Sequence, residues 1–184
     1  MVFVAAALII LLLCGLWILV PMFFGPPFVP ARTERIRRAL QLAGLKPDEI
    51  LYDLGCGDGR VLVIAARELG ARAVGIEIGH VQCAAAWLRA VLSGVQDRVQ
   101  VRWGNFYQSD LKDADVVFAY LTSAQAGRLE EHLGRQLKPG ARVVTISFDF
   151  PDWQPYDFND QQLIFLYKMP PTPGSLQYYL AQTR

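Results

Sequence analysis

The stretch Tyr52-Asp53-Leu54-Gly55-Cys56-Gly57-Asp58-Gly59-Arg60 decides the fold, because an apolar run passes into a glycine-rich turn that opens directly into a helical pattern. Glycines at alternate positions let the backbone turn tightly and come close to a ligand, and the N-terminal amides of the next helix lie nearby. A strand, such a turn and a helix in this order begin a Rossmann-like α/β fold. We therefore expect a cofactor to bind at this turn.

The charge of the turn narrows the choice of ligand. A dinucleotide fingerprint needs a third glycine where Arg60 stands, and the carboxylates of Asp53 and Asp58 would repel a pyrophosphate. Carboxylates instead attract a cationic ligand. S-adenosylmethionine carries a sulfonium and an ammonium group and no phosphate, so charge favours it. We expect it to bind at Asp53, Gly55, Gly57 and Asp58.

A second apolar run, residues 73–77, ends in the acid Glu77. In a second parallel strand this carboxylate would lie against the two ribose hydroxyls of the cofactor. An exposed acid at the end of a strand is the alternative interpretation of Glu77 alone. Strand, glycine turn, helix and distal acid together favour the cofactor site.

The chain from about Pro27 to Lys168 resembles the class I, seven-strand methyltransferases. Three short pieces are similar to one family within that class, namely Pro-Phe-Val-Pro at 27–30, the glycine turn at 53–60 and Phe-Asp-Phe-Pro-Asp-Trp-Gln-Pro at 148–155. This is the family of membrane-anchored protein-lysine methyltransferases that modify the adenine nucleotide translocase and the ATP synthase c subunit in mitochondria. The resemblance implies methyl transfer from S-adenosylmethionine to a lysine side chain of a membrane protein.

The resemblance also implies that Asn105 and Phe106, which follow the strand expected at 99–102, contact the adenine. The family more often has Asp at the position of Asn105. The amide carbonyl of Asn still offers an acceptor to the adenine amino group. An ordinary turn asparagine is the alternative.

Aromatic side chains follow the strands expected at 116–120 and 141–148. An apolar slot would disfavour the charged form of lysine, which titrates near about 10.4 in water, and aromatic faces would hold a cationic product. Tyr120 and Trp153 are the strongest candidates, whereas Phe148 and Phe150 also suit a core. The Asn-Pro-Pro-Tyr motif of nucleic-acid and glutamine N-methyltransferases is absent at 118–122, and the chain departs from the lysine family at 120–122. The substrate therefore stays open.

The N-terminus predicts a membrane anchor. Residues 1–31 contain no charged side chain, and residues 2–20 are almost all Ala, Val, Ile, Leu and Phe. About 20 apolar residues in a helix cross the hydrocarbon of a bilayer. A cleaved signal peptide is the alternative, but it has a basic n-region and a shorter apolar core. We expect a transmembrane anchor at 1–25, a linker with an amphipathic helix at 26–46, and the methyltransferase domain at 47–184.

Basic residues directly after the apolar run predict the orientation of the anchor. Arg32, Arg35, Arg37 and Arg38 lie within reach of the membrane surface. The positive-inside rule places such residues in the cytoplasm. We therefore expect a single-pass membrane protein with its catalytic domain on the cytoplasmic side.

Beyond Glu77, apolar runs and helical stretches alternate as in a doubly wound, seven-strand sheet. Residues 163–168 and 176–181 flank a proline-rich loop, which predicts a terminal antiparallel hairpin at the sheet edge. A net charge of +1 indicates no nucleic-acid partner, and the spacing of three cysteines and two histidines indicates no metal site.

Two other functions stay open at this point. The chain would also suit a methyltransferase for a lipid or quinone-like small molecule at the bilayer surface. It would equally suit a cofactor-binding module without catalysis in a membrane complex. The fate of a transferred methyl group separates these from lysine methylation.

Overall fold

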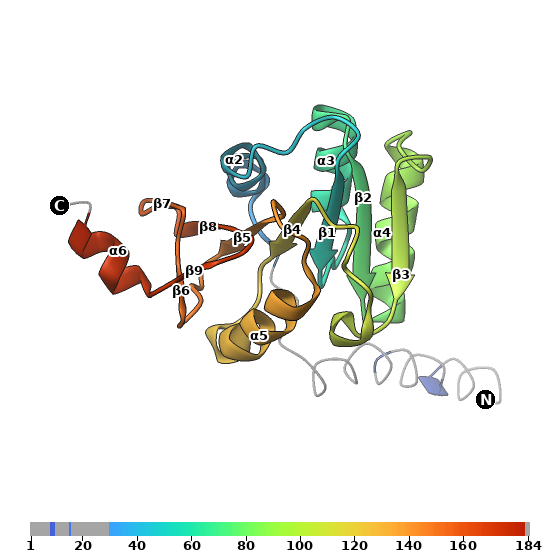
Figure 1. Ribbon diagram of the computed structural model, residues 1–184. Coiled ribbons are helices and arrows are strands. Elements are labelled where there is room, and N and C mark those ends of the chain that lie inside the picture. The colour runs from blue at the N-terminus through green and yellow to red at the C-terminus, as the bar shows by residue number, and fades with distance from the viewer. Residues whose placement is uncertain (1–7, 10–14, 16–29, 183–184) are drawn as a thin grey trace.

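The computed structural model describes residues 8, 9, 15 and 30–182. It contains a seven-stranded sheet with the strand order β3-β2-β1-β4-β5-β8-β7, together with a two-stranded sheet of β6 and β9 (Figure 1). The strands are β1 Ile50–Leu54, β2 Arg72–Glu77, β3 Val99–Trp103, β4 Val116–Ala119, β5 Arg142–Ile146, β6 Trp153–Gln154, β7 Asp157–Asn159, β8 Ile164–Lys168 and β9 Thr172–Pro173. The prediction of a Rossmann-like, doubly wound sheet is confirmed.

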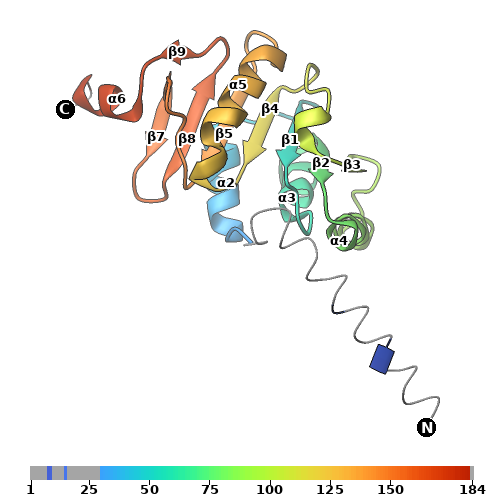
Figure 2. The same cartoon turned by 90° about the horizontal axis from the view of Figure 1, so that it is seen from below.

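Helices cover both faces of the large sheet. Figure 2 shows α2, α3 and α4 on one face and α5 on the other. The helices are α2 Thr33–Leu42, α3 Arg60–Leu69, α4 His80–Leu92, α5 Ala126–Gln136 and α6 Leu176–Gln182, with short 3-10 turns η1 Phe106–Gln108 and η2 Ser123–Gln125.

The core divides in two because strand residues alternate between the faces of the sheet. Leu51, Phe118 and Val144 pack with α2 and α3 in one apolar cluster, whereas Leu54 and Val117 pack with α5 in the other. Both clusters are buried, since an open α/β sheet is sandwiched between helix layers.

The strand registers bring the glycine turn, Glu77 and three loops to one edge of the sheet. β1, β2, β3, β4 and β5 are parallel neighbours, with Leu54 opposite both Ile76 and Ala119. The carboxyl ends of these strands therefore meet at the same edge, which is where ligands bind in open α/β sheets. The glycine turn, Glu77, and the loops after β3, β4 and β5 all leave the sheet there.

The predicted terminal hairpin is only partly correct. The strand expected at 163–168 forms as β8 and pairs antiparallel with β5. Its hairpin partner, however, is β7, and residues 176–181 lie in the helix α6. Ser175 caps the start of this helix, since its hydroxyl accepts the Tyr178 amide at 3.4 Å. Serine at a helix start satisfies amides that have no helical partner, and this favours a helix over an edge strand.

Among the described residues, no helix has both the length and the apolar character needed to cross a membrane. The anchor expected at 1–25 lies outside the described residues, apart from Leu8, Ile9 and Gly15. The amphipathic helix expected within 26–46 is α2, whose buried side chains are Ile36, Ala39 and Leu40.

Candidate functional site

The turn after β1 is built on glycines in the left-handed region. The φ angles are 82° at Gly55, 52° at Gly57 and 75° at Gly59, where side chains with a Cβ are strained. At Gly59 space is also limiting, since an added Cβ would lie 2.8 Å from the Cα of Ala86 in α4. The turn therefore needs glycine both to bend and to let α4 pack against the start of α3.

Glu77, the last residue of β2, is held against this turn. One oxygen of its carboxylate accepts the Gly57 amide at 2.9 Å, and the other accepts the Gly79 amide at 2.9 Å. A carboxylate offers about four acceptor positions, so two remain for a ligand. The two amides fix the orientation of the side chain, and binding of the ribose hydroxyls by Glu77 stays a prediction.

Asp53 lies under the turn as a buried acid. The residue is 2% exposed, and within the described residues its Oδ2 has no hydrogen-bond partner. Burial raises the pKa of Asp53 well above its usual range, and the nearby charges of Glu77 and Asp58 raise it further. An ammonium group beside Oδ2 would compensate this charge. The buried acceptor thus fits the amino group of S-adenosylmethionine.

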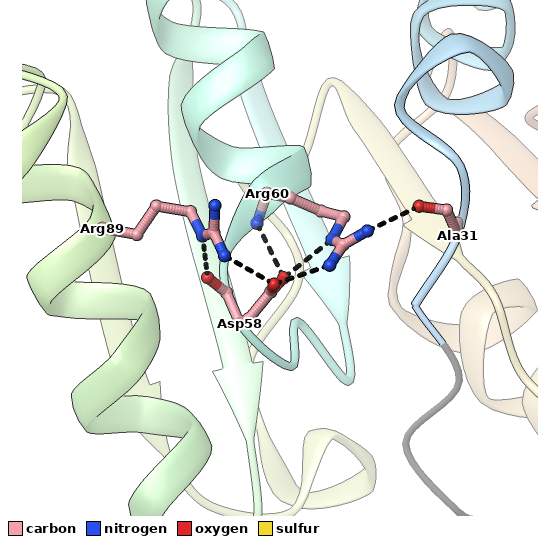
Figure 3. Close-up of polar contacts among 4 residues, drawn as sticks. All are labelled: Ala31, Asp58, Arg60 and Arg89. Carbon is pink, nitrogen blue, oxygen red and sulfur yellow. Dashed lines mark hydrogen bonds and ion pairs between the residues drawn. The ribbon is translucent and has the colours of Figure 1, made fainter.

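Asp58 pairs with two arginines, whereas its charge had suggested a cationic cofactor as its partner. Its carboxylate lies between two guanidinium groups, with Oδ2 2.7 Å from Arg60 and 2.7 Å from Arg89 (Figure 3). Burial alone would raise the pKa of Asp58, but hydrogen bonds and charges from Arg60 and Arg89 outweigh it and lower the pKa. Its carboxylate joins α3 to α4, and a direct role of Asp58 in cofactor binding stays a prediction.

Arg60 has a structural role that sequence reasoning missed. Besides binding Asp58, its Nη1 donates to the carbonyl oxygen of Ala31 at 2.9 Å. This contact ties the segment in front of α2 to the glycine turn, as Figure 3 shows. In the sequence, the signal for this role was Asp58, two positions before Arg60. Neighbouring opposite charges at a helix start pair readily.

Asn105 lies at the start of η1, after β3. Its Oδ1 accepts the Tyr107 amide at 3.0 Å, which is the capping role of a turn asparagine. The Gly104 amide donates to the Glu77 carbonyl at 2.9 Å, so this loop is close to the acid. A carbonyl oxygen accepts two hydrogen bonds, so Oδ1 of Asn105 keeps one acceptor position for a ligand. Adenine binding by Asn105 and by the half-buried Phe106 stays a prediction.

The four aromatic residues expected to form an acceptor slot do not share one face. Tyr120 is half-buried and packs with the cluster under α2 and α3, where the Arg35 guanidinium lies 5.9 Å from its ring centroid. Phe148, Phe150 and Trp153 belong to the cluster under α5. The sheet lies between the two groups, so the structure does not bring Tyr120 and Trp153 together.

The loop after β5 is fixed by buried hydrogen bonds. Thr145 donates its hydroxyl to the Phe148 carbonyl at 2.6 Å, and the Phe150 amide donates to the Tyr167 hydroxyl at 3.0 Å. The rings of Phe150 and Trp153 pack at 4.8 Å between centroids. Phe148, Phe150 and Trp153 are all buried. This placement favours a packing role, and contact with a methyl acceptor stays a prediction for these three residues.

Glu130 of α5 supports the same loop and was not anticipated. Its carboxylate accepts the Asp152 amide at 3.1 Å, and its side chain is buried. Burial raises the pKa of Glu130 from 4.5 to about 7. The apolar and polar positions along α5 gave no reason to single out this acid, because its partner is a backbone amide 22 residues away.

The detected cavity lies away from this edge, and the described residues offer no metal site beside it. The part of the chain that the structure describes contains no cluster of His, Cys, Asp and Glu suited to a metal ion. A cavity of about 270 Å³ lies at the amino ends of β1, β2 and β3, where Ile50, Arg72 and Val99 line it. That is the opposite edge of the sheet from the glycine turn, so this cavity is not the cofactor site.

Comparison with known proteins agrees with this geometry. Residues 53–157 match the family described as the ANTKMT methyltransferase domain. A protein-lysine N-methyltransferase from Saccharolobus islandicus is 36% identical over 148 residues, which cover 77% of this chain and 92% of that protein. An adenine nucleotide translocase lysine N-methyltransferase from Mus musculus is 34% identical over 137 residues, or 74% of this chain. The match spans only 59% of the mouse protein.

Among solved structures, an RNA methyltransferase from Salinibacter ruber in complex with S-adenosyl-L-homocysteine superposes with a TM-score of 0.76 at 38% identity. The match covers 77% of this chain and 94% of that one. Fold, site and relatives define an S-adenosylmethionine-dependent methyltransferase. More narrowly, the chain belongs to the ANTKMT methyltransferase domain family.

Proposed function

We propose that this enzyme is a membrane-tethered protein-lysine methyltransferase that acts on a membrane protein. One observation carries the proposal. The acid Glu77 is held by two backbone amides at the cofactor edge of a chain that is 36% identical to a relative named as a protein-lysine N-methyltransferase. The mouse relative, named for the lysine of a translocase, also supports a protein lysine as the acceptor.

The cofactor supplies an electrophilic methyl group on a sulfonium. In this proposal Glu77 accepts hydrogen bonds from the ribose hydroxyls, and the buried Asp53 carboxylate faces the amino group. Gly55 and Gly57 keep the backbone close to the ligand, because a side chain there would be strained as well as bulky. These residues bind and orient the cofactor, and positioning of this kind supplies much of the rate enhancement in a direct transfer.

The acceptor lysine must arrive as a neutral amine, since its lone pair attacks the methyl carbon while the carbon–sulfur bond breaks. The loop after β4 is the candidate rim for this step. Leu121 of that loop lies 3.6 Å from the position of an added Cβ on Gly55, so the loop borders the turn. The guanidinium of Arg35 near Tyr120 would disfavour a second positive charge and so favour the neutral amine. The incoming lysine ammonium loses its proton to water before the transfer, and the transfer leaves a methylammonium and the neutral thioether.

The tether is proposed from the sequence of residues 1–25. These residues are uncharged and almost entirely apolar, and four arginines follow between Arg32 and Arg38. The pattern suits a single span with the catalytic domain on the cytoplasmic side. A tether raises the local concentration of the enzyme near an acceptor in the same membrane.

The test uses radiolabelled S-adenosylmethionine, the purified full chain and membranes from a strain that lacks it. Products are separated into protein, organic extract and RNA. We expect label in a discrete protein band with the wild type and none with Glu77→Ala. Glu131→Ala is the matched control, because Glu131 is an exposed acid of α5 that pairs only with Arg135 among the described residues. Label in the organic extract would favour the lipid or quinone acceptor, and label in RNA would favour the activity named for the Salinibacter protein.

A further inference from the structure

The outward face of α4 is apolar along its whole length. Val81, Ala85, Leu88 and Leu92 recur at helical spacing. The exposed fractions are 50% for Val81, 50% for Leu88 and 79% for Leu92. The helix buries only Ala86 and Ala90, on its opposite side. A helix on the surface of a globular domain normally carries charged side chains on the face that α4 leaves apolar.

The flanks of α4 strengthen this pattern. Trp87 is 59% exposed beside the apolar face, and the helix contains no Asp or Glu. Its arginine, Arg89, is bound to Asp58. Large exposed apolar patches mark interaction sites, and an apolar helix face with an exposed Trp on its flank is typical of helices that lie in a membrane interface.

The entry of the N-terminal segment lies close to this helix. The described domain begins at residue 30, directly after the apolar segment. The carbonyl of Ala31 is bound by Arg60, and Arg60 shares the Asp58 carboxylate with Arg89 of α4 (Figure 3). Two ionic contacts and one hydrogen bond thus connect the membrane-proximal end of the domain to α4. A bilayer that holds the preceding segment is within reach of the α4 face.

We propose that the outward face of α4, defined by Val81, Ala85, Leu88 and Leu92, binds the interfacial region of a lipid bilayer. This inference rests on the membrane tether in the proposed function. The aliphatic side chains lie at the boundary of headgroups and acyl chains, and Trp87 lies at headgroup level. The tether and α4 then form two attachments of one rigid domain.

The second attachment fixes the catalytic edge relative to the membrane. α4 begins at His80, three residues after the proposed ribose ligand Glu77. A domain that rests on α4 therefore holds its cofactor site beside the bilayer surface. Such a site selects lysines that lie near the interface of a membrane protein, rather than lysines in a distant soluble domain.

The test measures membrane depth with a nitroxide spin label at Leu92→Cys, in the full chain reconstituted into vesicles of phosphatidylcholine and phosphatidylglycerol. Cys14 and Cys83 are replaced by serine, and the buried Cys56 is kept. We expect the label to meet oxygen, which dissolves in the bilayer, more readily than a water-soluble nickel complex. Glu131→Cys on α5, across the sheet, is the matched control and is expected to favour the nickel complex.

Equal nickel access at the two positions overturns the proposal. Spin–spin broadening at residue 92 that disappears on dilution with unlabelled chain also overturns it, because a second copy then covers α4. Flotation of the protein together with the vesicles and methyl transfer are measured on the same samples. Failure to float contradicts the tether itself, whereas flotation and transfer with a water-exposed label contradict only the docking of α4.

Discussion

The carboxylate of Glu77 accepts the Gly57 amide at 2.9 Å, so the end of β2 and the turn after β1 form one unit. This bond places an acid from one strand on the glycine turn of its neighbour. The acid cannot move without releasing the turn, so the two are fixed together at the cofactor edge of the sheet.

Replacing Glu77 tests the ribose role. Glu77→Gln keeps one acceptor for an amide but removes the charge that strengthens hydrogen bonds to hydroxyls. We expect the affinity for S-adenosylmethionine to fall roughly 10- to 100-fold, because hydrogen bonds to charged groups contribute about 1.5–3 kcal/mol. Isothermal titration calorimetry measures this loss. An affinity equal to that of Glu131→Ala would show that Glu77 does not contact the cofactor.

Asp53→Asn separates binding from stability. The folded chain raises the pKa of Asp53, so the wild type loses stability as the pH rises above the ordinary value of 3.8. The neutral amide removes this cost. We expect a Tm at pH 8 at or above that of the wild type, together with at least about tenfold weaker cofactor binding. A lower Tm with unchanged binding would contradict the assigned role.

Arg60→Lys tests the connection between the glycine turn and the segment before α2. Lysine keeps the charge but cannot reproduce the fork that binds Asp58 and the Ala31 carbonyl together. We expect faster amide hydrogen exchange at the start of α2 and weaker cofactor binding. Arg37→Lys is the control, because Arg37 forms an exposed pair with Glu68. Identical exchange in the two variants would mean that the contact does not order this segment.

Glu130→Gln tests the buried acid under the loop after β5. The pKa of Glu130 rises from 4.5 to about 7 on folding, so the wild type loses stability between these two values as the pH increases. Glutamine keeps a carbonyl acceptor for the Asp152 amide and has no charge. We expect equal Tm values near pH 4 and a Tm higher in the variant by a few degrees at pH 8, since 1 kcal/mol corresponds to roughly 2–4 °C at this size. A variant less stable at pH 8 would show that the charge itself is needed.

The sequence was most informative where short-range geometry determines structure. The spacing of Gly55, Gly57 and Gly59 required a tight turn between a strand and a helix, and the parallel order of strands placed Glu77 beside it. Asp53 is buried and its Oδ2 has no hydrogen-bond partner within the described part of the chain, and cofactor binding by this acid stays a prediction. These features depend on local chain direction and on the rule that parallel strands end at one edge.

Long-range pairing was not visible in the sequence. Asp58 looked like a ligand for a cation, but Arg89, 31 residues further on, comes close enough to pair with it. Tyr120 and Trp153 looked like one slot, but Tyr120 packs with the cluster under α2 and α3, whereas Trp153, in β6 of the small sheet, packs with the cluster under α5. The strand expected at 176–181 is a helix, whose first turn is stabilised by the Ser175 hydroxyl bound to the Tyr178 amide.

The most direct test of the central claim is tandem mass spectrometry of membrane proteins after incubation with the full chain and S-adenosylmethionine carrying a deuterated methyl group. We predict deuterated methyl-lysine in a membrane protein, present with the wild type and with Glu131→Ala and absent with Glu77→Ala. Deuterium confined to lipid or RNA, or methyl-lysine formed equally well by Glu77→Ala, would contradict a lysine methyltransferase that binds its cofactor through Glu77.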